Sequence, residues 1–376
     1  MAPSRLVLLL AFPLVAAACG SDDGGEQDGA TETSAARVTS TSASSTSANS
    51  VPDTSTAPGA EPETGDGTIT LYSGRDEELV GPLIEQFTAD TGIDVEARYG
   101  NAAEMGAALL EEGEATPADV FYSQEAGALG VLAKEGLLAE LPAEVMEQVD
   151  ARFRPSNGSA WVGVTARARV IAYNPELVAD PPASVLDLTD PKYEGQVGIV
   201  PGNASFQSFV TAFRISQGDD AARQWLEDMQ ANGVVTSYES NGDLLTAVDE
   251  GQIGIGLINH YYWAQLVAER GGPDGVNAQL VFADGDDPGA LVNATAAGLL
   301  ANAADDPDAL AFVEYLLSEP AQTYFAQETF EYPLLEGIAD PEGVPTLEEL
   351  QGPQIDLTDL DSLQQTQAML ADVGLI

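Results

Sequence analysis

The sequence predicts an α/β protein with two lobes joined by a hinge. From residue 68 onward, apolar runs of strand length alternate with stretches in which apolar residues recur every three or four positions. Such alternation predicts crossover units and a mainly parallel sheet. The alternating strands and helices form two groups. Two long extended segments, 161–174 and 291–301, cross from one group to the other. Two crossings between two alternating units indicate a hinge.

The elements before the first crossing alternate strictly between strand and helix. The first helix is the clearest, because Leu79, Leu83 and Phe87 recur at helical spacing and Gly92 provides a stop. The predicted elements are the strand 68–73, a helix within 75–92, the strand 93–99, the helix 101–113, the strand 118–123 and the helix 125–136.

A proline-rich loop follows the first crossing, and the alternation then restarts. The helix at 306–318 has the clearest start, since Asp306 is a good cap and Pro307 suits the first helical position. The predicted elements are the strand 196–202, the helices 205–216, 219–233 and 242–251, the strand 253–259, the helix 261–270, the strand 278–283, the crossing 291–301 and the helices 306–318 and 319–327.

The N-terminus indicates export. Arg5 precedes an apolar run, residues 6–19, that is too short to span a bilayer but suits the core of a signal peptide. The only cysteine, Cys19, directly follows three alanines, and a lone thiol cannot form an internal disulfide. Residues 1–19 are therefore predicted to be a lipoprotein signal peptide with a lipobox at Cys19. An ordinary cleaved signal with a stray cysteine is the alternative.

The rest of the chain divides into a tether and two lobes. Residues 20–67 contain almost no large apolar side chain, so they are predicted to be a disordered tether rich in Ser, Thr, Asp and Gly. The crossings assign 68–165 together with 290–376 to lobe 1, and 166–289 to lobe 2.

The charge of the chain is strongly acidic. It contains 61 acidic residues against 13 basic ones, for a formal net charge of -48. A field of this sign repels nucleic acid and anionic lipid, so neither is an expected partner. Adaptation to a salty environment and strong solvation of an exported protein both remain open as its cause.

The usual catalytic signatures are missing from the sequence. There is no G-x-S-x-G elbow and no Walker loop, and a single histidine excludes zinc sites of the usual composition. Acidic residues are so abundant that carboxylate pairs arise by chance, so a surface-anchored hydrolase stays open as the less favoured alternative.

The stretch NHYYWAQL, residues 259–266, places two tyrosines at the predicted junction between a buried strand and a helix. Phenolate is a hard oxygen ligand, and its reference pKa of about 10 means that a strong Lewis acid such as ferric iron must deprotonate it. Aromatic packing around Trp263, or two walls of an organic-ligand pocket, is the other interpretation of Tyr261 and Tyr262. The neighbouring His260 is predicted to be solvent-facing or hydrogen-bonded rather than a ligand.

Several motifs are similar to those of the bacterial ferric-ion-binding proteins of ABC-type iron importers. They are TLYSGRDEE, PADVFYSQEAGALG, WVGVTARARVIAYN, PGNASFQS, SNGDLLTAVDEGQIGIGLINHYYW and FEYPLLEGI, in the order of that family. The resemblance implies the type II periplasmic-binding-protein-like fold, with the ligand trapped between the lobes. It also implies a monomeric binding protein, not an enzyme.

The resemblance assigns roles to individual residues. Tyr261 and Tyr262 match the paired iron-binding tyrosines, and a synergistic anion, phosphate or carbonate, is expected at five further positions. These are Asn203, Ala204, Ser205, Asn241 and Asn259. A helix start near Ser205 offers free N–H groups to an oxyanion. N-capping and turn formation are the structural interpretation of the same residues.

This chain departs from the family pattern at the lobe 1 positions. Asp76 stands where relatives have a histidine, and Gln124 where they have a glutamate. Asp76 is therefore either a carboxylate ligand or a helix N-cap. Glu125 is one residue out of register. Among the few cations, Arg75 is predicted to bind the anion. Gln124, Glu125 and Arg167 are candidates to support the residues that bind the ligand. Arg169 is another cation able to clamp an anion or bridge the lobes.

The sequence thus predicts a lipoprotein that captures Fe(III) with a synergistic anion and delivers it to an ABC permease driven by its ATPase. The protein is expected to be exported and anchored through Cys19 to the outer face of the cell membrane, or to be periplasmic. The incomplete ligand set leaves open a phosphonate or another small anion as the cargo.

Overall fold

The computed structural model describes residues 65–353 and 355–376. The predicted signal peptide, Cys19 and nearly all of the predicted tether lie outside the described residues. Among the helices that are described, none combines the length and the apolar character needed to cross a membrane.

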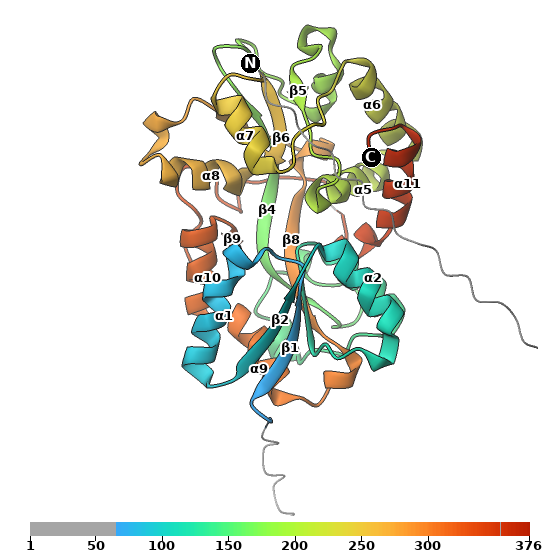
Figure 1. Ribbon diagram of the computed structural model, residues 1–376, viewed down its shortest axis with the longest axis vertical. Helices are drawn as coiled ribbons and strands as arrows, with labels where there is room; N and C mark the ends of the chain where they lie inside the picture. The colour runs from blue at the N-terminus through green and yellow to red at the C-terminus, as the bar shows by residue number, and fades with distance from the viewer. Residues whose placement is uncertain (1–64, 354) are drawn as a thin grey trace, which may run out of the picture. The chain divides into compact units, whose positions relative to one another are not determined.

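The strands form a mixed sheet (Figure 1). Its hydrogen-bonded order is β2-β1-β3-β8-β4-β6-β5, and β7 and β9 both pair with β4. The strands are β1 (Thr68–Ser73), β2 (Asp94–Tyr99), β3 (Val120–Ser123), β4 (Val162–Tyr173), β5 (Val197–Gly198), β6 (Ile255–Asn259), β7 (Gln279–Val281), β8 (Val292–Leu299) and β9 (Tyr332–Pro333).

Strand β4 connects the two groups of strands. Its first part, up to Ala168, pairs with β8, whereas Arg169 to Tyr173 pair with β6. Both predicted crossings, 161–174 and 291–301, are thus confirmed as long strands. The expectation of a mainly parallel sheet is wrong: β1 is parallel to β2 and β3, and β5 to β6, but every pairing made by β4 and β8 is antiparallel. The two crossing strands run in opposite directions and occupy the centre of the sheet.

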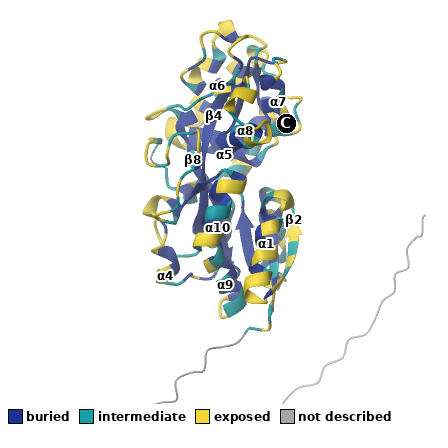
Figure 2. Ribbon diagram, turned by 90° about the vertical axis from the view of Figure 1, so that its left-hand side faces the viewer, coloured by how far each residue is buried: buried dark blue, intermediate teal, exposed yellow. Residues whose placement is uncertain are grey.

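Helices cover the sheet and turn their exposed faces outward (Figure 2). In the first helix the buried residues are Val80, Leu83, Ile84 and Phe87, which is the predicted spacing. The helices are α1 (Glu77–Thr91), α2 (Ala102–Glu112), α3 (Ala126–Lys134), α4 (Ala143–Met146), α5 (Ala204–Gln217), α6 (Asp219–Ala231), α7 (Asn241–Asp249), α8 (His260–Glu269), α9 (Pro307–Leu316), α10 (Glu319–Tyr324) and α11 (Leu363–Asp372).

One irregular segment was not anticipated from the sequence. Helix α10 continues into a π-helical turn, Phe325–Thr329, and Phe330 then adopts a left-handed conformation with φ of 58°. It is the one non-glycine residue with positive φ in the described part of the chain. Turns of this kind often accompany functional sites, and the next residue, Glu331, belongs to the site described below.

The C-terminal segment contacts helices from both groups. The 3-10 turn Leu357–Asp361 packs against α3, where a Cβ on Gly127 would lie 2.4 Å from the Leu360 carbonyl oxygen. Helix α11 packs on α5 instead, and the hydroxyls of Thr211 and Thr366 are 2.7 Å apart. The segment is therefore a third connection beside β4 and β8.

Candidate functional site

A cavity of about 620 Å³ brings together residues from distant parts of the sequence. On one side are the loop after β1, the start of α1 and the end of β2; on the other is α8. Its lining residues are Arg75, Asp76, Glu77, Glu78, Leu79, Tyr99, Gly100, Tyr261, Tyr262 and Gln265. We call this space the tyrosine cavity.

Tyr261 and Tyr262 lie in the first turn of α8, directly after the buried strand β6. Tyr261 is buried and Tyr262 is half-buried, and their ring centroids are 4.4 Å apart with an interplanar angle of 31°. Neither hydroxyl has a hydrogen-bond partner within residues 65–353 and 355–376, although buried phenols usually find one. Both phenol oxygens are thus available to a ligand.

The environment of Tyr261 keeps its phenol protonated. Burial raises the pKa of Tyr261 well above its ordinary value, and the neighbouring Tyr262 adds to this rise, whereas the charge of Arg75 opposes it. A group that binds Tyr261 as phenolate must therefore displace the proton, which a trivalent cation does and a neutral organic ligand does not.

Asp76 is exposed at the edge of the tyrosine cavity. It occupies the N-cap position of α1, but its side chain makes no capping hydrogen bond. The N-cap interpretation is therefore confirmed for the position of Asp76, and its carboxylate, which makes no capping bond, remains available to the cavity.

Arg75 and Glu331 form a buried ion pair beside the tyrosine cavity. The Arg75 Nη2 to Glu331 Oε2 distance is 2.8 Å, and the two side chains are 1% and 0% exposed. The hydroxyl of Thr329 donates to the same carboxylate at 3.1 Å. Arg75 was predicted to bind an anion; the structure places it at the tyrosines with a carboxylate partner of its own.

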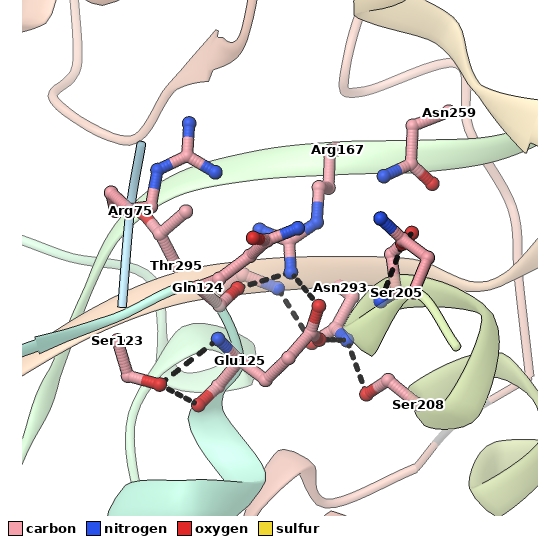
Figure 3. Close-up of polar contacts among 12 residues, drawn as sticks. Arg75, Ser123, Gln124, Glu125, Arg167, Ser205, Ser208, Asn259, Asn293 and Thr295 are labelled. Carbon is pink, nitrogen blue, oxygen red and sulfur yellow. Dashed lines mark hydrogen bonds and ion pairs between the residues drawn. The ribbon is translucent and has the colours of Figure 1, made fainter. Parts of the chain in front are cut away.

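A second group of polar residues, most of them buried, does not line the tyrosine cavity (Figure 3). Arg167 contacts Glu125 at 2.6 Å and donates to the backbone carbonyl of Gln124. Asn293 donates to Glu125 and, at 2.8 Å, to Ser208. The group also includes Arg169, Ser205 and Asn259, and we call the whole set the polar cluster. Gln124, Glu125 and Arg167 thus support one another within it rather than lining the cavity.

Arg169 is a buried cation without a carboxylate partner in the described part of the chain. Its guanidinium donates to Ser205 Oγ and Asn259 Oδ1, both at 3.2 Å, and to the Leu257 carbonyl at 3.1 Å. Burial lowers the pKa of Arg169 to about 10. A buried cation satisfied only by neutral acceptors favours an anion beside it.

The space at the polar cluster is small. The cavity lined by Arg167, Arg169, Ser205, Asn259, Leu291 and Asn293 has a volume of about 10 Å³, which suits roughly one water molecule. An oxyanion would therefore require these side chains, or the two groups of strands, to move apart.

The predicted anion-binding residues occupy three helix starts, those of α5, α7 and α8; Asn259 is at the N-cap position of α8 but makes no side-chain capping bond. Asn203 caps α5, and its Oδ1 accepts from the Ser205 N–H at 3.0 Å, so the capping interpretation is confirmed for Asn203. Ala204 is the first residue of α5. At α7 the cap is Ser240, and the buried amide of Asn241 has no hydrogen-bond partner among the described residues. For Asn241 the capping interpretation is wrong.

His260 is fully buried, so the solvent-facing interpretation is wrong and the hydrogen-bonded one is confirmed. Its Nδ1 accepts from the Ala168 N–H at 3.2 Å, and its ring stacks on Tyr332 with centroids 4.4 Å apart. Burial lowers the pKa of His260 to about 3. The ring is therefore neutral and does not line the tyrosine cavity.

Sequence reasoning missed several residues of the site. Tyr99 and Gln265 line the tyrosine cavity, and Glu331 and Asn293 pair with predicted residues. For Tyr99 a signal was present, because the last residue of a strand in a parallel unit lies at the edge where such sites form. For Glu331 there was none, since its partner is 256 positions away.

Comparisons with known proteins identify the family and the fold. Residues 115–354 match the model of the bacterial extracellular solute-binding proteins. The Fe(3+)-binding periplasmic protein of Serratia marcescens is 34% identical over 321 residues, 85% of this chain and 94% of that protein. The structure of iron-bound HitA from Pseudomonas aeruginosa has a TM-score of 0.76 and 34% identity, covering 82% of this chain and 99% of that one.

A third relative is a Trichodesmium protein whose structure is in complex with iron and citrate ligands. Its TM-score is 0.67 at 26% identity, covering 82% of this chain and all of that one (100%). These structures confirm the predicted two-lobed binding-protein fold, and the chain belongs to the family of bacterial extracellular solute-binding proteins.

Proposed function

We propose that this chain captures ferric iron in the tyrosine cavity and delivers it to an ABC permease. The observation that carries the proposal is the pair Tyr261 and Tyr262, whose unbonded phenols line one cavity with the free carboxylate of Asp76. Two phenolates and one carboxylate balance the charge of Fe(III), and all three are the hard oxygen ligands that it prefers. The chain acts as a binding protein and catalyses no reaction.

The polar cluster supports a synergistic anion, phosphate or carbonate. Arg169 supplies an unbalanced buried charge, and the unbonded Nδ2 of Asn259 supplies a donor. The unbonded amide of Asn241, at the start of α7, is a further candidate donor outside the cluster. Ser205 lies in the first turn of α5, and its N–H is bonded to Asn203 Oδ1, so an anion that used this N–H would replace the cap. Anion and iron would together hold the lobes closed, and the permease would reopen them.

The remaining assignments follow from the sequence. We propose that the protein is a monomer, exported and anchored through a lipid on Cys19, and that the permease is driven by an ATPase. Lobe 1 then comprises 68–165 and 290–376, and lobe 2 comprises 166–289. The same polar cluster would serve a protein whose cargo is a phosphonate or another small anion, and such a protein would not need ionised tyrosines.

A visible-light titration of the purified protein with ferric citrate tests the proposal. A tyrosinate-to-iron charge-transfer band is expected, and it should strengthen when phosphate or carbonate is added if the polar cluster holds the anion. A folded protein that stays colourless would overturn ferric binding and favour the anion alone, which isothermal titration with phosphate or a phosphonate would then reveal.

Iron affinity should fall as the pH falls. The raised pKa of Tyr261 means that its proton is present throughout the neutral range and must leave when iron binds. Loss of the phenol protons of Tyr261 and Tyr262 alone predicts that the apparent affinity drops at least about 100-fold for each unit by which the pH is lowered. Competition with citrate between pH 6 and 8, corrected for citrate protonation, measures the slope. A corrected affinity independent of pH would rule out phenolate ligands.

A further inference from the structure

Tyr99 lies at the edge of the sheet from which the tyrosine cavity is built. It is the last residue of β2 and pairs in parallel register with Ser73, the last residue of β1. Arg75 and Asp76 follow directly from that strand end. Tyr99 therefore lines the cavity from the side opposite α8, which carries Tyr261 and Tyr262.

The phenol of Tyr99 is placed for a ligand rather than for packing alone. It is half-buried, and its hydroxyl has no hydrogen-bond partner in the described part of the chain. The hydroxyl lies over α1, where a Cβ on Gly81 would be 4.0 Å from it and 3.5 Å from Glu77 Cγ. A phenylalanine ring would pack here as well as the tyrosine ring does, so the hydroxyl of Tyr99 indicates a polar partner such as a bound ligand.

The other polar side chains on the β1, β2 and β3 side are largely committed. Arg75 pairs with Glu331, and Glu125 pairs with Arg167 away from the cavity. Gln124 is not among the residues that line the cavity. Asp76, Glu77 and Glu78 line the cavity with available but exposed carboxylates, so Tyr99 is the half-buried anionic ligand that this side can offer.

Charge balance points the same way. Phenolates at Tyr261 and Tyr262 leave one positive charge on Fe(III). The carboxylate of Asp76 is exposed to water, whereas a phenolate at half-buried Tyr99 would place compensating negative charge inside the partly desolvated site. In the protein without iron, the phenol of Tyr99 resists ionisation. Burial is the largest cause, and the negative charges of Glu77 and Glu85 raise its pKa further. A trivalent cation reverses that balance.

We propose that Tyr99 binds the same ferric ion as Tyr261 and Tyr262, through a phenolate contributed across the cavity; this inference rests on the proposed function. On binding, the phenol loses its proton to solvent and the oxygen forms a bond to iron, with no change of oxidation state. Tyr99 thereby joins Asp76 as a lobe 1 ligand, on the side of the cavity where the glutamate of the family pattern is replaced by Gln124. The metal would then link the end of β2 to α8.

The test compares Tyr99→Phe with Tyr238→Phe, each loaded with ferric citrate. Tyr238 is a matched control: it is also half-buried, burial also raises its pKa, and it lies outside the tyrosine cavity. The readouts are the intensity and position of the charge-transfer band per bound iron, with iron content measured separately, and the affinity in competition with citrate.

Tyr99→Phe should still bind iron, but its band should lose about one third of its intensity and shift, because one of three phenolates is gone. Its affinity should fall, while Tyr238→Phe should match the parent. If Tyr99→Phe keeps the parent's band although Tyr261→Phe and Tyr262→Phe weaken it, the inference about Tyr99 is overturned and the proposed function stands. A colourless parent protein would overturn both.

Discussion

Replacing both Tyr261 and Tyr262 with phenylalanine should abolish ferric binding and leave the fold intact. Each substitution removes a phenol oxygen and keeps the ring. Even residues that only support a metal ligand change affinity by about 10- to 100-fold, so loss of a ligand should exceed about 100-fold per tyrosine. The measurement is iron retention and the charge-transfer band after dialysis against citrate.

Stability provides the control for this double variant. Neither hydroxyl has a hydrogen-bond partner among the described residues, so the free energy of unfolding should change by no more than about 0.5 kcal/mol for each. Tyr238→Phe should retain iron as the parent does. A double variant that binds ferric iron as tightly as the parent would show that the tyrosine cavity is not the metal site.

Glu331→Gln should cause a large loss of stability, because it leaves the buried guanidinium of Arg75 without its counter-charge. The pair is 1% and 0% exposed and 2.8 Å apart. Breaking a buried pair from one side typically costs about 3–5 kcal/mol. Urea denaturation followed by circular dichroism measures the free energy of unfolding.

Two further variants separate this effect from a general loss of charge. Asp180→Asn breaks the exposed pair with Lys192, whose side chains are 87% and 45% exposed, and should change stability by less than about 0.5 kcal/mol. The double variant Arg75→Met with Glu331→Leu should recover much of the loss, since apolar replacements of buried pairs are often neutral. An unchanged stability in Glu331→Gln would contradict a charged pair in the folded protein.

Local sequence features were sufficient to predict most elements. Apolar spacing in α1 and the length of the crossing at 161–174 depend on neighbours a few residues away, and both were confirmed. The sheet was predicted less well, because the direction in which β4 meets β8 depends on residues that pair 130 positions apart, such as Thr165 and Thr295.

The site shows the same division. Tyr261 and Tyr262 were found because they are adjacent in the sequence, and the capping role of Asn203 because Ser205 is two residues away. Asn241 does not cap its helix, because the hydroxyl of the preceding residue, Ser240, accepts the capping hydrogen bond at the start of α7. Spacing alone does not distinguish these two cases.

The sequence by itself therefore determined the order of strands and helices and the paired phenols, and the resemblance of its motifs to the ferric-ion-binding proteins indicated the class of cargo. Only the tertiary structure decided that Tyr99 lies across from that pair, that Glu331 neutralises Arg75, and that Arg169 has no counter-charge among the described residues. The physical reason is that helix periodicity and capping act within a few residues, whereas charge pairing and cavity formation depend on which distant segments the sheet brings into contact.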